Sequence, residues 1–383
     1  QSEVGRIHKY IALAYAANIK LYQAYQQDET THAVTSINKE LLREVVSLCD
    51  QVTASNRYGL LDDFQGLDLV ANENGKESVF AIQYSMNDGT ESAGRINWSN
   101  LLNSPGGGSP YGGDGFFLPS QDLINAYQTD ANGLPDFNYQ SKSDYSWAVL
   151  NNGVYTLQNT TPNVDPRLDF VVGRPTITWK TYPDKPCEGW VRDKETYGYN
   201  CAKRFWVSPE SSDMFNGWPW GASQLNWQII RYADILLWKA EALIELNEGD
   251  GLETARDLIN QIRNRARNSA YVKDFNDHSK YAANYLVNPY PADVWNQDYA
   301  RQALRWETRL EKALEGERFF DLVRWGIVET TMNKYITAES DNRIYYANAH
   351  FTGGKDEYYP VPNNQYGFSG GKYVQNPGYA PFN

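Results

Sequence analysis

The segment WETRLEKALEGERFFDLVRWG, residues 306–326, places five acidic residues among arginines and large aromatic side chains. Trp306, Leu310 and Leu314 recur at four-residue spacing, which predicts a helix that packs along its length. Acids beside arginines are compatible with two different structures. They can form the acid pair of a sugar-cleaving active site, or they can form ion pairs that hold helices together.

Glu311 and Glu315 are one helical turn apart, so their side chains lie near the separation that a retaining glycosidase requires. Every acid pair at this spacing on a helix meets that condition, so the spacing alone is weak evidence for catalysis. Neighbouring arginines would also lower the pKa of these acids, which does not suit a general acid. A second set can form ion pairs at three-residue spacing: Arg318, Asp321 and Arg324. We therefore favour a structural network and keep a glycoside hydrolase as the alternative.

The bulk composition is that of a folded, acidic protein. Its 383 residues are 41% hydrophobic and 21% charged, with a formal net charge of −12. Nucleic-acid binding depends on clustered Lys and Arg, so this charge argues against a nucleic-acid partner. The 12 Trp and 28 Tyr stand out. Most of these rings are expected to pack in cores, and some to lie exposed as stacking surfaces for a ligand such as a sugar.

Periodicity divides the chain into four parts. Residues 1–60 predict a helical hairpin of tetratricopeptide-like size, and 231–335 predict a second helical portion that begins with RYADILLWKAEALIELN. Residues 61–230 alternate short strand-like runs with turns and are rich in Trp, and 336–383 predict an extended segment. The predicted fold is mainly α, a helical-repeat scaffold with a loop-rich portion that contains a few short strands.

No catalytic or metal-binding motif survives inspection. The segment GFSGG, residues 367–371, fits the G-x-S-x-G pattern, but no His follows it. The four His are scattered without metal-ligand spacing. A Ca²⁺ ion held by loop carbonyls would leave no motif, and that alternative stays open. Cys187 and Cys201 flank a polar loop and can form a disulfide in an oxidising compartment, with two reduced thiols as the alternative. Cys49 lies on an apolar helical face and is expected to pack as a small hydrophobe.

The order of several motifs resembles the SusD/RagB family. The similar segments include GDGFFLPSQDLINAY (113–127), the helical run from 231, EGERFFDLVRWG (315–326) and QNPGY (375–379). The resemblance covers essentially the whole chain. It implies a non-enzymatic, surface-exposed outer-membrane lipoprotein of Bacteroidetes that takes part in polysaccharide utilisation. Such a protein binds oligo- or polysaccharide, or in RagB-like members peptide, and delivers it to a SusC-like TonB-dependent transporter.

The resemblance also implies an N-terminal lipid anchor and an earlier helical region, neither of which is in this sequence. We therefore expect that the N-terminal part is missing, and that the anchor would be the only membrane attachment. The family supplies no fixed ligand motif, so candidate ligand residues are chosen as polar groups and rings in Gly-, Pro- or Asn-rich loops. They are Trp98, Tyr111, Asp114, Trp190, Trp218 and Trp220, with Asn100 and Asn216 as further hydrogen-bonding candidates.

Overall fold

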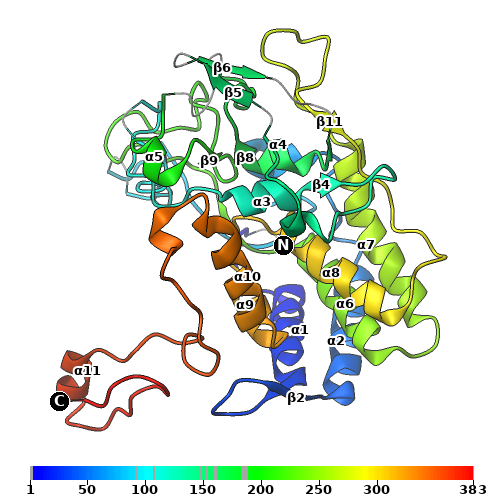
Figure 1. Ribbon diagram of the computed structural model, residues 1–383. Helices are drawn as coiled ribbons and strands as arrows, with labels where there is room; N and C mark the ends of the chain where they lie inside the picture. The colour runs from blue at the N-terminus through cyan, green and yellow to red at the C-terminus, as the bar shows by residue number, and fades with distance from the viewer. Residues whose placement is uncertain are drawn as a thin grey trace.

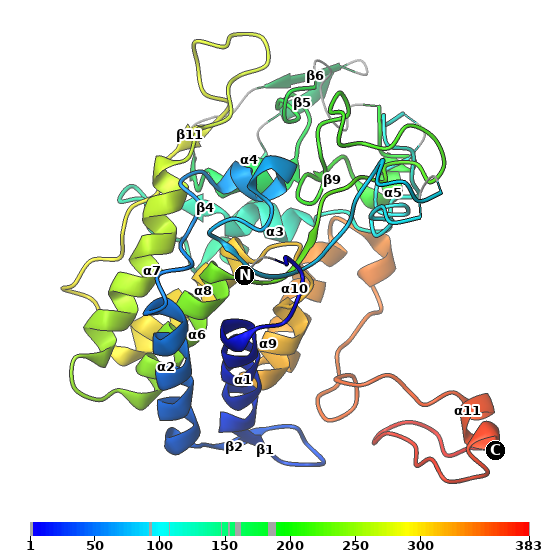
Figure 2. The ribbon, with the colours of Figure 1, turned by 180° about the vertical axis from the view of Figure 1, so that it is seen from behind.

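The structure is a computed structural model of the 383-residue chain. It describes residues 3–91, 94–106, 108–146, 148–151, 154–157, 162–182 and 189–382. The chain folds into a helical scaffold that carries a loop-rich portion at one end, with a separate C-terminal segment beside it (Figures 1 and 2). The predicted mainly α fold is therefore confirmed.

Five helices form the scaffold and pack side by side, in both views of the ribbon. They are α1 (Lys9–Ala24), α2 (Lys39–Thr53), α6 (Tyr232–Leu246), α7 (Gly251–Asn268) and α8 (Gln297–Glu311). The first two and the α6–α7 pair are the helical hairpins that the sequence predicts. A short antiparallel ribbon of β1 (Tyr25–Gln27) and β2 (Val34–Ile37), which periodicity did not indicate, lies between α1 and α2.

Helix α6 is the centre of the scaffold because it is apolar on nearly every side. Its buried residues contribute to two hydrophobic clusters, one shared with α1 and α2 and the other with α7 and α8. Ile235 and Ala242 belong to the first cluster, and Leu236 and Ile244 to the second. Full burial of one aliphatic side chain stabilises a fold by about 1.5–3 kcal/mol, so a helix buried all round fixes the positions of its neighbours.

The loop-rich portion contains short strands that pair two or three at a time. β3 (Ser78–Ile82) pairs with β10 (Trp227–Arg231), and β8 (Val172–Gly173) with β9 (Cys201–Ala202), both antiparallel. β5 (Ala148–Asn151) and β6 (Val154–Leu157) also pair antiparallel, and β11 (Asn284–Tyr285), β7 (Asn163–Val164) and β4 (Gln128–Thr129) form a three-stranded sheet in that order. The short helices here are α3 (Gln121–Ala126), α4 (Arg167–Val171) and α5 (Lys194–Tyr197), with 3₁₀ turns η1 (Phe64–Asp68), η2 (Val70–Asn72) and η3 (Tyr139–Ser141).

The C-terminal part begins with α9 (Arg318–Arg324) and α10 (Val328–Ser340). Helix α10 continues past residue 335, where the sequence predicted the start of an extended segment. After η4 (Ile344–Tyr346) the chain leaves the scaffold and ends in an outlying loop that carries α11 (Asn363–Phe368), as both views show.

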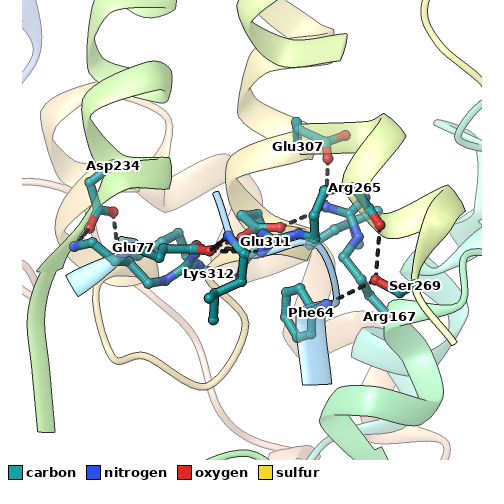
Figure 3. Close-up of polar contacts among 12 residues, drawn as sticks. Phe64, Glu77, Arg167, Asp234, Arg265, Ser269, Glu307, Glu311 and Lys312 are labelled. Carbon is teal, nitrogen blue, oxygen red and sulfur yellow. Dashed lines mark hydrogen bonds and ion pairs between the residues drawn. The ribbon is translucent and has the colours of Figure 1, made fainter. Parts of the chain in front are cut away.

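The acids of the opening segment lie at the centre of a buried ion-pair network. The two Glu311 carboxylate oxygens accept hydrogen bonds from Arg231 (2.7 Å), Arg265 and Arg167 (3.2 Å). Glu307, one turn earlier, pairs with Arg167 at 2.5 Å and with Arg263 at 3.0 Å. Figure 3 shows Arg167 of α4 and Arg265 of α7 pointing toward Glu307 and Glu311 of α8. The network joins α4, β10, α7 and α8, which lie far apart in the sequence.

The pKa values within this segment diverge. Burial alone would raise the pKa of Glu311, but Arg265, Arg231 and Arg167 outweigh it and lower the pKa to about 2. The expectation of depressed pKa values is therefore confirmed for Glu311. It is confirmed for Glu315 as well, where Arg231, Lys312 and Arg204 outweigh burial and lower the pKa. By contrast, burial raises the pKa values of Glu317 and Asp321. Asp321 pairs with Arg324 at 2.8 Å, as predicted, whereas Arg318 forms no ion pair with a carboxylate among the described residues.

Candidate functional site

Three loop segments of the middle portion converge and form what we call the aromatic loop cluster: residues 97–106 with 108–115, 189–207, and 213–223. Asn97 N–H donates to the Ser223 carbonyl at 2.8 Å, which joins the first segment to the third. Arg192 N–H donates to the Pro105 carbonyl at 3.3 Å, which joins the second segment to the first. The first segment lies far from the other two in the sequence, and these hydrogen bonds join all three. Together the three segments contain every predicted ligand residue.

The cluster is built on a small aromatic core. Tyr111 packs on Trp206, with ring centres 4.4 Å apart, and Trp179 packs on Trp190 at 5.4 Å. The Trp179 indole N–H donates to the Tyr111 hydroxyl at 3.0 Å, and this hydroxyl in turn donates to the Val207 carbonyl at 2.7 Å. All four rings pack against other rings of the core, and the polar atoms of Tyr111 and Trp179 are hydrogen-bonded within the protein, which fixes the positions of the loops.

Two predicted ligand rings belong to this core rather than to the surface. Tyr111 is 1% exposed and Trp190 is 5% exposed. The expectation that they present stacking faces is wrong, because other aromatic side chains cover those faces. Asn100 is also buried, and its amide N–H donates to the Phe205 carbonyl at 2.6 Å. These residues shape the surface from beneath.

Three other predicted rings do lie at the surface. Trp98 is 46% exposed, Trp218 is 64% exposed and Trp220 is 54% exposed. Large aromatic side chains are usually well buried, so three exposed indoles in one loop cluster are unusual. Trp218 and Trp220 occupy the turn between Phe215 and Ala222, where Phe215 N–H donates to the Ala222 carbonyl at 2.8 Å.

Asp114 lies at the edge of the cluster and forms an ion pair with Arg192 at 2.8 Å. Next to it is a cavity of about 400 Å³ between the glycine-rich loop (residues 104–106 and 108–115) and the end of α10. Exposed aromatic rings missed by the sequence analysis line this cavity: Phe116, Tyr197 and Tyr345. Phe116 and Tyr197 lie next to glycines and so met the criterion that was used to choose candidate ligand rings. Nothing in the sequence indicates that Tyr345 lies near them.

The glycine-rich loop is held in a shape that a side chain would disturb. Gly113 has a φ of +93°, and a Cβ atom on it would lie 2.4 Å from the Ser104 carbonyl oxygen. Gly89 has a similar φ of +87° in another loop, but a Cβ there would meet no atom within 4 Å.

We expect Gly113→Ala to lower the thermal midpoint clearly more than Gly89→Ala does. Both variants carry the strain of a positive φ, about 1–2 kcal/mol, and only Gly113→Ala adds a clash with the backbone. Differential scanning fluorimetry of the two variants checks this. Equal midpoints would contradict the description of the loop as tightly packed.

The cysteines and charged side chains do not suggest a metal site. Among the described residues, no group of three or more His, Cys, Asp or Glu side chains is placed to hold a metal ion. Cys49 is a free, buried thiol, as expected, and burial raises its pKa to about 12. Cys201 is disulfide-bonded, but Cys187 lies outside the described residues, so the pairing of these two stays a prediction.

The structure is thus a helical scaffold that presents exposed aromatic rings on firmly packed loops. The SusD family model matches residues 76–379, so the chain belongs to the SusD family. No curated protein sequence matches the chain.

Solved structures agree with this family. A SusD homolog from Bacteroides thetaiotaomicron is 19% identical, with a TM-score of 0.62 over 98% of this chain and 64% of the other. A SusD superfamily protein from Bacteroides vulgatus is 21% identical, with a TM-score of 0.60 over 95% of this chain and 61% of the other. Surface glycan-binding protein A from Bacteroides thetaiotaomicron is 17% identical, with a TM-score of 0.53 over 99% and 65%. The chain thus spans less than two thirds of the length of these structures.

Proposed function

We propose that the protein binds oligo- or polysaccharide at the cell surface through the aromatic loop cluster and delivers it to a SusC-like TonB-dependent transporter. The observation that carries this proposal is the set of three exposed indoles, Trp98, Trp218 and Trp220, above a packed aromatic core. A sugar ring presents flat apolar faces edged by hydroxyl groups. Flat indole faces can stack on the apolar faces of the sugar, and loop amides and carboxylates can form hydrogen bonds with its hydroxyl groups.

Family membership supports the same proposal, as does the likeness in fold to a surface glycan-binding protein. Attachment to the outer membrane would come from a lipid anchor at the N-terminal end of the whole protein. No helix among the described residues has both the length and the apolar character to cross a bilayer. A RagB-like protein that takes up peptide is the alternative within the family.

Binding without catalysis is the favoured activity. A glycosidase needs one carboxyl group held protonated near neutral pH and room for substrate between two acids. Glu311 is fully buried, with its pKa lowered to about 2, and Glu315 pairs with Arg231, Arg204 and Lys312. Neither of these two acids can meet a sugar without disrupting the scaffold, so they do not support the hydrolase alternative.

Affinity electrophoresis tests the proposal. The protein is run through native gels that contain laminarin, xyloglucan or another soluble polysaccharide, and reducing ends are measured in parallel. We expect retardation by at least one polysaccharide, with no increase in reducing ends. The absence of retardation by every polysaccharide would contradict glycan binding, and binding of a peptide mixture instead would favour the RagB-like alternative. Release of reducing ends would show that the protein is an enzyme.

A further inference from the structure

A second large concavity lies between α8 and α10, and we call it the α8–α10 groove. It has a volume of about 640 Å³, and residues of α3 and α9 also line it. Figure 1 shows where these helices lie in the fold. Its floor is apolar, with Trp306 from α8, Phe319 and Leu322 from α9, and Met332 from α10. It shares only Ser120 and Tyr335 with the cavity beside Asp114, so its lining is otherwise separate from the candidate glycan surface.

The charge of this groove is opposite to that of the whole protein. Its lining contains six cationic and two anionic side chains, although the chain as a whole has a net charge of −12. Three of the cations are neutralised within the protein: Arg301 by Glu245, Arg309 by Asp122, and Lys312 by Asp234. The other three, Arg305, Arg318 and Lys334, form no ion pair with any carboxylate in the described part of the chain.

Two of these unpaired cations lie together. The Arg318 guanidinium donates to the Arg305 backbone carbonyl at 3.3 Å, and both guanidinium groups lie over the Trp325 ring, at 5.8 and 5.3 Å respectively. Burial lowers the pKa of Arg318 to about 9, and the nearby charge of Arg309 acts in the same direction. A partly buried guanidinium without a carboxylate partner is energetically costly, so an anion placed here would be bound strongly.

The walls of the groove are two helix faces. Arg301, Arg305 and Arg309 repeat every four residues along α8, and Thr331 and Tyr335 do the same along α10. Side chains at this spacing form ridges, and a third helix packs well into the space between two such ridges. A groove with an apolar lining between two such helix faces suits an amphipathic helix, whose apolar face can pack against both.

We propose that the α8–α10 groove binds an amphipathic helix of a partner polypeptide. The apolar side chains of that helix fill the floor beside Trp306 and Phe319. Its glutamate or aspartate side chains pair with Arg305, Arg318 and Lys334. This is a protein-binding site in addition to the glycan surface, and it does not depend on glycan binding.

Two designed helical peptides test this proposal. Each has 15 residues, the length of α8, and carries leucines at the spacing of one apolar helix face. One has glutamates beside this face, and the other has lysines at the same positions. Binding of the fluorescein-labelled peptides is followed by anisotropy. We expect the glutamate peptide to bind at least about tenfold more tightly than the lysine peptide, since only the former can neutralise the unpaired cations.

Substitutions in the groove show whether the glutamate peptide binds there. We expect Arg305→Gln with Arg318→Gln to weaken binding of the glutamate peptide about tenfold or more. The thermal midpoint without peptide should change little, because the lost contacts with Trp325 and the Arg305 carbonyl are offset by removal of two partly buried charges that have no ion-pair partner. The matched control, Arg57→Gln with Arg95→Gln, removes the same charge from loops outside the groove and should leave affinity unchanged.

Three results would overturn the proposal. The first is equal binding of the two peptides, or no binding of either. The second is an equal loss of affinity in the groove variant and the control variant. The third is a dimer that forms with rising concentration in sedimentation and disappears in the groove variant. The groove would then bind a second copy of this chain rather than a partner polypeptide. Glycan retardation of the groove variant is measured in parallel and is expected to match that of the unmodified protein.

Discussion

Replacing Glu311 with glutamine is expected to lower the free energy of unfolding by about 3–5 kcal/mol. Loss of one partner from a buried ion pair has this cost because the remaining charges stay buried without compensation. Here Arg167, Arg231 and Arg265 would all lose a carboxylate oxygen at once. A domain is typically stable by about 5–15 kcal/mol, so the variant would lose a third or more of its stability. Urea unfolding followed by tryptophan fluorescence measures this difference.

The matched control is Glu40→Gln on α2, which removes an exposed acid that pairs with Arg43 and should leave the midpoint unchanged. The effect of Glu311 also has a defined pH dependence. Because the folded pKa is lowered to about 2, this stabilisation is complete above the unfolded pKa of about 4.5 and is lost as the pH falls toward 2. The protein and the Glu311→Gln variant should therefore converge in stability over that interval. A constant difference down to pH 2 would contradict the network.

The second large effect is expected on binding. Trp218→Ala with Trp220→Ala should abolish retardation by the matched polysaccharide in affinity gels, or weaken it by at least about tenfold. Each stacked ring contributes on the order of 0.5–1.5 kcal/mol to binding, and an exposed ring contributes little to folding. The thermal midpoint should therefore stay nearly unchanged.

The control for ring removal is Tyr359→Ala, which deletes an exposed aromatic side chain from the C-terminal segment. It should leave the gel mobility unaffected. If the Trp218→Ala, Trp220→Ala variant is retarded as fully as the unmodified protein, the protein binds glycan but at another site.

The helical scaffold could be predicted from the sequence because its signal is local. Apolar residues at three- and four-residue spacing in 1–60 and 231–268 identify the helices, and burial on every side of α6 follows from its composition. The arginine partners of the buried acids could not be predicted. Arg167 and Glu307 are 140 residues apart in sequence, and nothing in either segment indicates that α4 reaches α8.

The candidate site was predicted in part, and the failures have one physical reason. A tryptophan or tyrosine in a glycine-rich loop can point outward, as Trp218 does, or inward, as Tyr111 does. Which of the two happens depends on other loops that supply a covering ring, here Trp179 and Trp206. These contacts cross long stretches of sequence without a repeating pattern. The loops could be identified from composition, but the orientation of each ring required the structure.

The most direct test of the central claim, that the aromatic loop cluster binds glycan, is hydrogen exchange with and without the polysaccharide that retards the protein. Glycan-dependent protection is predicted in residues 97–106, 108–115 and 213–223, while the scaffold helices α1, α2, α6 and α7 remain unchanged. Protection confined to those helices or to the α8–α10 groove, with no change in the loop cluster, would contradict the claim.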